Sequence, residues 1–150
     1  MTLRRKFNGA KQCTEAWAAR SKKQEHERKE CAMIQSFRDI KVYQKSYDVM
    51  IELYRKVQEF PIDELYGLTS QIKRASTSIP LNIAEGYGKR ENVNEFKRFL
   101  LMAIGSCDEM KVLLDISKDL GFIDEEFHKT KEQEYDEIGR MLRGLRNNWQ

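Results

Sequence analysis

The chain has 150 residues, of which 40% are hydrophobic and 34% charged, with two prolines and eight glycines. This length favours one domain over two, and this composition is typical of a soluble helical protein rather than a β-sandwich or a membrane protein. No apolar run approaches the roughly 18 to 20 residues that span a bilayer, and the N-terminus lacks the apolar core of a signal peptide. We therefore expect a cytoplasmic protein without membrane contact.

The net charge of +3 is unevenly distributed along the chain. Residues 1–32 hold nine Lys and Arg against four Asp and Glu, a net of +5, and residues 33–150 carry the remaining −2. The run ARSKKQEHERKE within residues 1–32 is polar and has no apolar stripe, as in a solvated extension. We predict a basic, flexible extension over residues 1–32 and one folded domain over residues 33–150, although a basic segment can also favour nucleic acid.

The two amphipathic helices predicted first cover residues 38–60 and 63–85. The apolar face of the first contains Tyr43, Tyr47, Met50, Ile51, Tyr54 and Val57. Pro61 lacks an amide hydrogen and disfavours helix in the residue before it, so Phe60 should end this helix. Asp63 is the candidate N-cap of the second helix, whose stripe is Leu65, Leu68, Ile72, Ala75, Ile79 and Ile83.

Two further helices follow. Asn92 with Glu95 three residues later is typical of a capping box, and it precedes a stripe made of Phe96, Phe99, Leu100, Ala103, Cys107, Met110, Leu114 and Ser117. Gly121 indicates a left-handed C-cap, with Phe122 folded back on the last turn. Asp124 then caps a fourth helix, whose face holds Phe127, Tyr135, Ile138, Leu142, Leu145 and Trp149. Short connections place consecutive helices side by side in opposite directions, so we predict an all-α, antiparallel up-down-up-down four-helix bundle.

The stretch SIPLNIAEGYGKR contains a proline inside the second helix and a Gly-x-Gly near its end. Pro80 removes one amide donor, and its ring pushes against the carbonyl four residues back, so we predict a kinked second helix. Gly86 and Gly88 could in principle cradle phosphate, but phosphate-binding glycine motifs lead from a strand to a helix. We therefore interpret Gly86 as a C-cap and Gly88 as part of a turn. Lys89 and Arg90 then lie just before a helix N-terminus, where free amides favour anions.

Cysteine spacing indicates neither a zinc site nor a disulfide framework. Cys13, Cys31 and Cys107 are odd in number, far apart and without a Cys-x-x-Cys pair. We expect reduced thiols, with Cys107 as a small core residue, and we expect no metal or other cofactor.

Four stretches taken together resemble a known family. They are FRDIKVYQKSYDV, FPIDELYGLTSQIKRASTSIPLNIAEGYGKR, NEFKRFLLMAIGSCDEM and SKDLGFI. In this order they resemble the bacterial four-helix-bundle proteins named for 23S ribosomal RNA intervening sequences, also called S23 proteins. The resemblance covers Phe37 to about Leu145, and the residues before Met33 have no counterpart in it.

This resemblance implies a homo-oligomer, a ring-like pentamer as in structurally known relatives. It also implies a distant similarity to the accessory variability protein of diversity-generating retroelements, which binds nucleic acid and a reverse transcriptase. No catalytic activity is implied. The family motif falls on positions whose roles the resemblance leaves open: Pro80, Asn82, Glu85, Gly86, Phe99, Gly105 and Ser106.

Charges separate by bundle end if the helices alternate in direction. One end holds ten cations against six acids, about +4, and its cations are Arg38, Lys41, Lys45, Lys89, Arg90, Lys97, Arg98, Arg140, Arg143 and Arg146. The opposite end holds six cations against 13 acids, a balance of −7. A basic rim repeated around an oligomer would attract a polyanion such as RNA or DNA. Helix dipoles and solubility also place charges in this way, so that alternative stays open.

No set of residues assembles a convincing enzyme site. Glu125-x-x-His128 resembles half of a di-iron motif, but the chain's other histidine, His26, cannot complete the second half. We therefore expect Glu125 and His128 to be surface residues at a helix start. Glu85 and Arg98 are expected to meet as a buried or interfacial ion pair rather than in acid-base catalysis.

We predict a non-enzymatic, self-assembling protein that binds structured nucleic acid, and we favour RNA over DNA as that nucleic acid. The residues predicted to bind it are Lys89, Arg90, Lys97, Arg98, Arg140 and Arg143. The alternative is a protein-interaction adaptor, for example for a polymerase, with no direct nucleic-acid contact and with partly exposed anchors among Tyr43, Tyr47, Tyr54, Tyr87 and Trp149. Self-assembly is favoured because a lone bundle would expose apolar residues outside the stripes, including Phe99, Leu101 and Met102.

Overall fold

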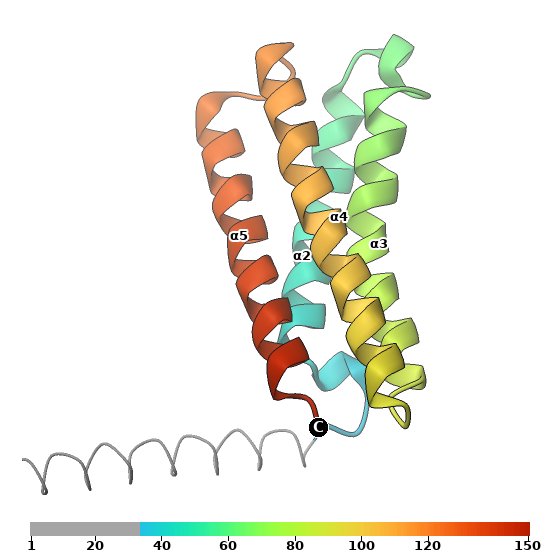
Figure 1. Ribbon diagram of the computed structural model, residues 1–150. Coiled ribbons are helices and arrows are strands. Elements are labelled where there is room, and N and C mark those ends of the chain that lie inside the picture. The colour runs from blue at the N-terminus through green and yellow to red at the C-terminus, as the bar shows by residue number, and fades with distance from the viewer. Residues whose placement is uncertain (1–33) are drawn as a thin grey trace, which may run out of the picture. The chain divides into compact units, whose positions relative to one another are not determined.

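Four α-helices make up most of residues 34–150, the part of the chain that the computed structural model describes (Figure 1). Their bounds are Lys41–Lys56 for α2, Leu68–Gly88 for α3, Val93–Asp119 for α4 and Glu125–Asn148 for α5. Short 3₁₀ turns lie at Phe37–Asp39, Val57–Glu59 and Ile62–Glu64, and the described residues contain no strand. The prediction of an all-α fold with four helices is confirmed. The predicted extension over residues 1–32 lies outside the described residues.

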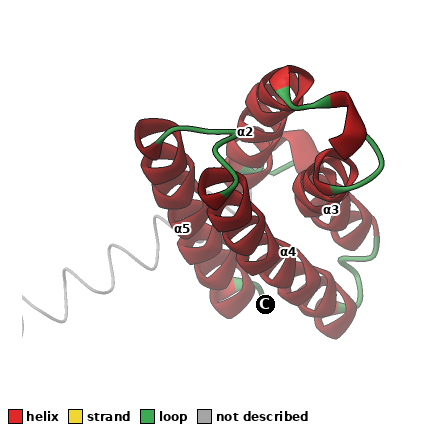
Figure 2. Cartoon of the chain, turned by 90° about the horizontal axis from the view of Figure 1, so that it is seen from above, coloured by secondary structure: helices red, strands yellow, loops and turns green. Residues whose placement is uncertain are grey.

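Each described helix packs against its neighbour along the chain, and α5 also contacts α2. Seen from above, the four helices stand at the corners of a quadrilateral with their shared core between them (Figure 2). Contacts between α4 and α5 run in reversed numerical order, since Lys111 pairs with Asp136 whereas Asp115 meets His128. Residues with higher numbers on α4 therefore contact residues with lower numbers on α5.

The predicted stripes of α3, α4 and α5 supply most of the core, whereas the stripe predicted for α2 is largely wrong, because Val42, Val49 and Leu53 are buried outside it. The most buried side chains of the core come from all four helices and include Leu53, Ile72, Ile79, Ile83, Phe96, Leu100, Met110, Leu114, Tyr135, Ile138 and Leu142. Two predicted stripe residues, Tyr47 and Leu65, are instead exposed. Leu65 lies in the turn before α3, so helical spacing does not apply to it. Cys107 is buried as predicted, and burial raises the pKa of its thiol to about 12.

The first predicted helix begins later than its sequence pattern indicated. Ile40 has extended backbone and a buried side chain, and α2 starts only after it. The preceding 3₁₀ turn has its own capping box, in which the Ser36 hydroxyl bonds the backbone and Asp39 accepts from the Ser36 amide. At the other end α2 stops at Lys56, earlier than predicted, and the 3₁₀ turn Val57–Glu59 leads to Phe60, which is extended before Pro61.

The predicted N-cap at Asp63 is wrong. Asp63 lies within a 3₁₀ turn, and α3 begins five residues later at Leu68. Gly67 occupies the N-cap position and has no side chain to bond the helix. The carboxylate of Glu64 takes that role and accepts a hydrogen bond from the amide of Leu68 at 3.0 Å.

Gly86 and Gly88 are not a C-cap and a turn, because α3 continues through both of them. A Cβ atom added at Gly86 would lie 2.6 Å from Cβ of Phe99 and 2.9 Å from a ring carbon of Phe96. The buried Gly86 is therefore a point at which the backbone of α3 lies close to α4. Glycine is needed here because α3 and α4 leave no room for a Cβ atom, and not because the backbone has an unusual φ angle.

Three further caps agree with the sequence. Asn92 accepts hydrogen bonds from the amides of Asn94 and Glu95, although Glu95 bonds Arg98 and does not close a capping box. Asp124 accepts from the amide of Phe127 at 2.8 Å and caps α5. Gly121 ends the turn after α4 with a φ of 74°, and the amide of Phe122 bonds the carbonyl of Ser117 as in a Schellman motif.

Candidate nucleic-acid interface

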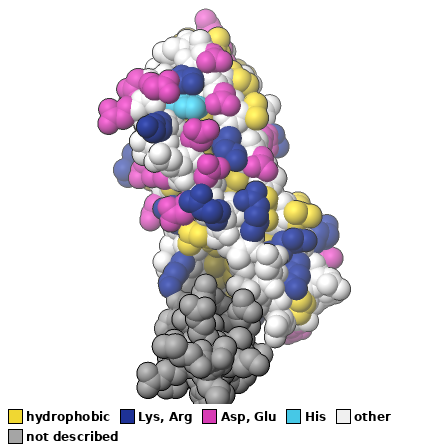
Figure 3. Space-filling model, turned by 60° about the vertical axis from the view of Figure 1, so that its left-hand side comes forward, with side chains coloured by type: hydrophobic (Ala, Val, Ile, Leu, Met, Phe, Trp, Pro, Cys, Tyr) yellow, Lys and Arg dark blue, Asp and Glu magenta, His cyan; other side chains and the backbone are white. Residues whose placement is uncertain are grey.

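Opposite charges occupy different parts of the surface in Figure 3. Asp and Glu side chains gather around the histidine in the upper part, whereas Lys and Arg dominate the middle and the lower right. Three of the predicted binding residues, Lys97, Arg140 and Arg143, form no ion pair or hydrogen bond with another described residue. Arg140 and Arg143 are exposed on α5, and Lys97 is half-buried on α4. Among the six predicted binding residues, these three have the most freedom to meet an external anion.

The geometry of α5 places Arg140 and Arg143 beside α4. Residues four and seven positions after Asp136 share its helix face, and Asp136 bonds Lys111 of α4 at 3.0 Å. Arg143 also lies close enough to Cys107 of α4 to affect its thiol electrostatically. The structure therefore aligns both arginines along the junction of α4 and α5.

The other three predicted cations are held by neighbours on their own segment. Lys89 pairs with Glu85 at 2.9 Å, and Arg98 pairs with Glu95 at 2.9 Å. Arg90 donates to the carbonyl of Tyr87 at 3.1 Å and lies over its ring. These contacts reduce the charge that the three side chains present to solvent. The ion pair predicted between Glu85 and Arg98 does not form, because each side chain has a partner within one turn of its own helix.

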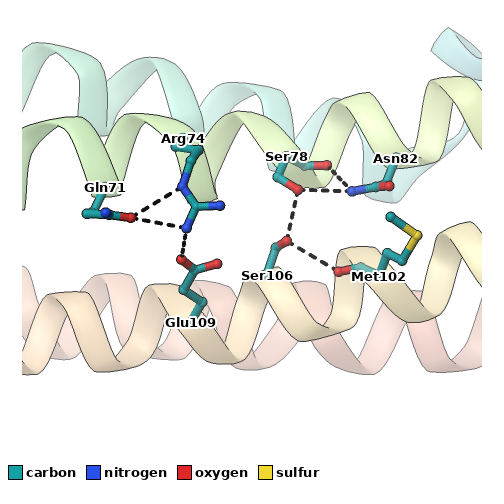
Figure 4. Close-up of polar contacts among 7 residues, drawn as sticks. All are labelled: Gln71, Arg74, Ser78, Asn82, Met102, Ser106 and Glu109. Carbon is teal, nitrogen blue, oxygen red and sulfur yellow. Dashed lines mark hydrogen bonds and ion pairs between the residues drawn. The ribbon is translucent and has the colours of Figure 1, made fainter.

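Two family-motif residues, Asn82 and Ser106, belong to the polar contacts where α3 meets α4 (Figure 4). The hydroxyls of Ser78 and Ser106 lie 2.9 Å apart, and the amide group of Asn82 donates to both the carbonyl and the hydroxyl of Ser78. Ser106 also bonds the carbonyl of Met102. A second bridge joins Arg74 to Glu109. Asn82 and Ser106 thus have a structural role that the sequence left open.

The remaining motif positions divide between core and surface. Gly86 and Phe99 lie together at the close approach described above. Phe99 is 5% exposed, which agrees with its place in the predicted stripe and contradicts the expectation that a lone bundle would expose it. Pro80 is buried inside α3, which runs unbroken through it. Gly105 is exposed, and a Cβ added there would meet nothing within 4 Å.

His128 is a core-edge residue rather than a surface residue. It is 5% exposed, and its Nε2 lies 2.6 Å from a carboxylate oxygen of Asp115 on α4. The prediction was wrong because the first turn of α5 packs against α4. Glu125 is exposed as expected and pairs with Lys118 at 3.7 Å. Across residues 34–150, no three or more His, Cys, Asp or Glu side chains are grouped so that they could hold a metal ion.

Sequence reasoning missed the ion pairs of Lys131. This lysine is 2% exposed and bonds Glu52 of α2 and Glu134 of α5. Burial alone would lower its pKa, but the hydrogen bonds that Lys131 donates to Glu134 and Glu52 outweigh this effect and raise the pKa. The spacing of Lys131 and Glu134 was a weak signal, and nothing in the sequence pointed to Glu52. This cluster joins α2 to α5.

None of the described helices has the length and apolarity needed to cross a bilayer. The described residues thus form a four-helix protein with unneutralised cations along one helix junction. The family model described as 23S rRNA-intervening sequence protein matches residues 38–144, and the chain belongs to this family. The family resemblance found in the sequence is confirmed. No curated protein matches the chain.

Proposed function

We propose that this protein is a non-enzymatic, self-associating helical bundle that binds structured nucleic acid through the junction of α4 and α5. RNA is the nucleic acid that we favour. The observation that carries the proposal is the set of three cations without a described partner, Lys97, Arg140 and Arg143. The family name, which refers to ribosomal RNA, supports RNA over other polyanions. A cytoplasmic location and a ring of five subunits remain predictions.

The proposal includes the alternating direction of the four helices and a kink of α3 at Pro80. The reversed order of contacts between α4 and α5 supports the alternation. Alternation gathers the start of α4 and the end of α5 at one end of the bundle. One basic surface then contains Lys97, Arg140 and Arg143. Further positive charge at its edge comes from Lys89, Arg90 and Arg98.

Binding of this kind is dominated by phosphate contacts. Each phosphate that a cation neutralises releases counterions, so the logarithm of the binding constant falls by about 0.9 per phosphate for each tenfold rise in salt. Three free cations predict a slope of about −2 to −3. Self-association would multiply the contacts by the number of subunits that reach the same nucleic acid.

The test is a fluorescence-anisotropy titration of the full chain with a folded RNA and a duplex DNA of equal length at several salt concentrations. Arg140→Glu with Arg143→Glu should weaken binding at least tenfold and flatten the salt slope. The matched control is Arg55→Glu with Lys129→Glu, because both residues are exposed cations without a described partner, one on α2 and one near the start of α5. Equal losses in both variants would mean that net charge, rather than this surface, controls binding.

A protein-interaction adaptor is the second candidate function. Its support is the exposed apolar surface of α4, which includes Leu101, Met102 and Val112. Among the aromatic anchors predicted for it, Tyr87 and Trp149 are buried and Tyr47 is exposed. Binding to a protein through apolar contacts should depend little on salt. Failure of the full chain to bind RNA or DNA even at low salt would favour this function over the first.

A further inference from the structure

An aromatic row lies along α2 and the turn before it, on the side of α2 that meets α3. The row consists of Phe37, Tyr43, Tyr47 and Tyr54. Spacings of 4 and 7 residues place the three tyrosines on one helix face, and the hydroxyl of Tyr54 lies 2.9 Å from that of Thr77 on α3. The side where α2 meets α3 is opposite the junction of α4 and α5 (Figure 2). The aromatic row is therefore separate from the basic surface described above.

The rings of the aromatic row contact one another and are partly open to solvent. The ring centroids of Tyr43 and Tyr47 lie 6.1 Å apart with 27° between the ring planes, and Phe37 meets Tyr43 edge-on at 4.9 Å. Tyr47 is 45% exposed, and the other three rings are half-buried. Within the described part of the chain, neither the Tyr43 nor the Tyr47 hydroxyl has a hydrogen-bond partner. Rings of this kind offer a surface on which nucleobases can stack.

A cation lies over a ring at each end of the aromatic row. The guanidinium carbon of Arg38 is 4.6 Å from the centroid of the Phe37 ring, and Nζ of Lys73 on α3 is 5.5 Å from that of Tyr54. Neither cation forms an ion pair with another described residue. Both are therefore free to contact phosphate groups while the rings between them contact bases.

The charges around the aromatic row favour an anionic ligand. The turn Phe37–Asp39, α2 and α3 together carry seven Lys and Arg against four acids, which are Asp39, Asp48, Glu52 and Glu85. Lys131 pairs with Glu52 and Lys89 with Glu85, whereas Asp39 accepts from the amide of Ser36. Of these four acids, Asp48 alone has no described partner, and it lies about 100° around the helix from Tyr47. Ion pairs also hold three of the cations: Lys45, Lys56 and Arg74.

A shallow hollow of about 470 Å³ adjoins the far end of the aromatic row. Its lining includes Tyr54, Lys73, Thr77 and Leu81, and Leu81 is 61% exposed. This volume lies within the range of small-ligand sites. A ring and an aliphatic side chain beside a lysine suit a planar base that carries a phosphate.

We propose that this side of the protein binds an unpaired, single-stranded segment of RNA, with its bases stacked on the aromatic row and its phosphates beside Arg38 and Lys73. The inference rests on the proposed nucleic-acid binding and adds a second surface to it, which takes unpaired nucleotides rather than folded RNA. Bases inside a duplex are already paired and stacked, so the row cannot reach them. From Tyr43 to Tyr54 the row extends about 16 Å along α2, which is long enough for more than one base.

The test is a fluorescence-anisotropy titration of the full chain with two probes of equal length and charge. One probe is single-stranded polyuridylate, and the other is a chain of abasic ribose phosphates. Polyuridylate should bind at least tenfold more tightly, because only its bases can stack, and one stacked base changes affinity roughly tenfold. Tyr47→Ala should remove most of this difference, whereas Tyr47→Phe should keep it because a phenylalanine ring also stacks.

The matched control is Tyr66→Ala. Tyr66 is 92% exposed in the connection between α2 and α3 and lies outside the aromatic row, so its loss should leave the binding of both probes unchanged. Arg140→Glu with Arg143→Glu should leave the ratio of the two affinities unchanged, because both arginines lie at the opposite side of the bundle. Tyr47→Ala should also match the unchanged protein in far-UV circular dichroism and in sedimentation velocity.

The possible results separate this inference from the proposed function. Equal affinity for the two probes, or a difference that Tyr47→Ala leaves intact, overturns the stacking surface even if folded RNA binds through Arg140 and Arg143. Loss of self-association in Tyr47→Ala also overturns it, because the aromatic row would then be an interface between copies of the chain. A protein that binds neither probe and no folded RNA refutes the proposed function together with this inference.

Discussion

Replacing Gly86 by alanine tests whether the close approach of α3 and α4 is as tight as the structure indicates. The added Cβ would lie 2.6 Å from Cβ of Phe99 and 2.9 Å from Cδ2 of Phe96. The first of these atoms is attached directly to the α4 backbone, and both rings are buried. Neither phenylalanine can turn away without disturbing the core, so α3 and α4 would have to separate.

Two opposing effects determine how much Gly86→Ala changes the free energy of unfolding. Alanine in a helix interior is more favourable than glycine by about 0.5 to 1 kcal/mol, which would stabilise the protein. Overpacking of a close-packed contact costs about 1 to 3 kcal/mol. Because the clash involves an atom fixed to the backbone, we expect an overpacking cost near the upper end of that range. The net loss in the free energy of unfolding should then be about 1 to 2 kcal/mol.

The assay is urea unfolding of the full chain followed by far-UV circular dichroism. With a slope of about 1.5 kcal/mol per molar urea, the midpoint should fall by about 1 M. Gly144→Ala is the control, since its Cβ meets open space within α5 and helix propensity should leave the midpoint unchanged or raise it. A Gly86→Ala protein as stable as the control would refute the tight contact between α3 and α4.

Two other predictions concern a helix cap and a buried thiol. Asp124→Ala removes the cap of α5 and should lower the free energy of unfolding by about 1 kcal/mol in thermal unfolding, whereas Asp124→Asn should lose much less. Burial raises the pKa of Cys107 from 9.0 to about 12, so its contribution to stability is fully present below pH 9 and is lost as the pH rises towards 12. Urea midpoints should therefore fall less steeply above pH 9 in Cys107→Ala than in the unchanged protein; parallel curves would contradict this.

The number of helices, both ends of α4 and the start of α5 could be predicted because they depend on local physics, whereas each predicted end of α2 and α3 was off by three to five residues. Apolar spacing places a stripe on one face, and the caps at Asn92, Gly121 and Asp124 are set by residues within a few positions of each helix end. The same local signals failed at Asp63. Asp, Glu and Gly are all common near helix starts, and nothing local distinguished a cap at Asp63 from the one supplied by Glu64.

The candidate site was predicted less completely than the fold because its features depend on contacts between helices. A glycine that ends a helix and a glycine that admits a neighbouring helix look alike in sequence, and Gly86 proved to be the second kind. His128 was predicted to be a surface residue and the ion pairs of Lys131 were not predicted, because both depend on contacts with another helix, α4 for His128 and α2 for Lys131. The six predicted cations could likewise be named, but not divided into paired and unpaired ones.

The packing of each helix on the next also has consequences for how fast the protein folds. Proteins dominated by contacts between segments close in sequence fold in microseconds to milliseconds. Helices α3 and α4 are joined by four residues, whereas the Lys131 and Glu52 contact between α5 and α2 closes a separation of 79 residues. Closing the longer loop costs more entropy, so α3 and α4 should pair early and α2 should dock on α5 late. Destabilising changes at Gly86 should therefore slow folding, whereas those at Lys131 should mainly speed unfolding.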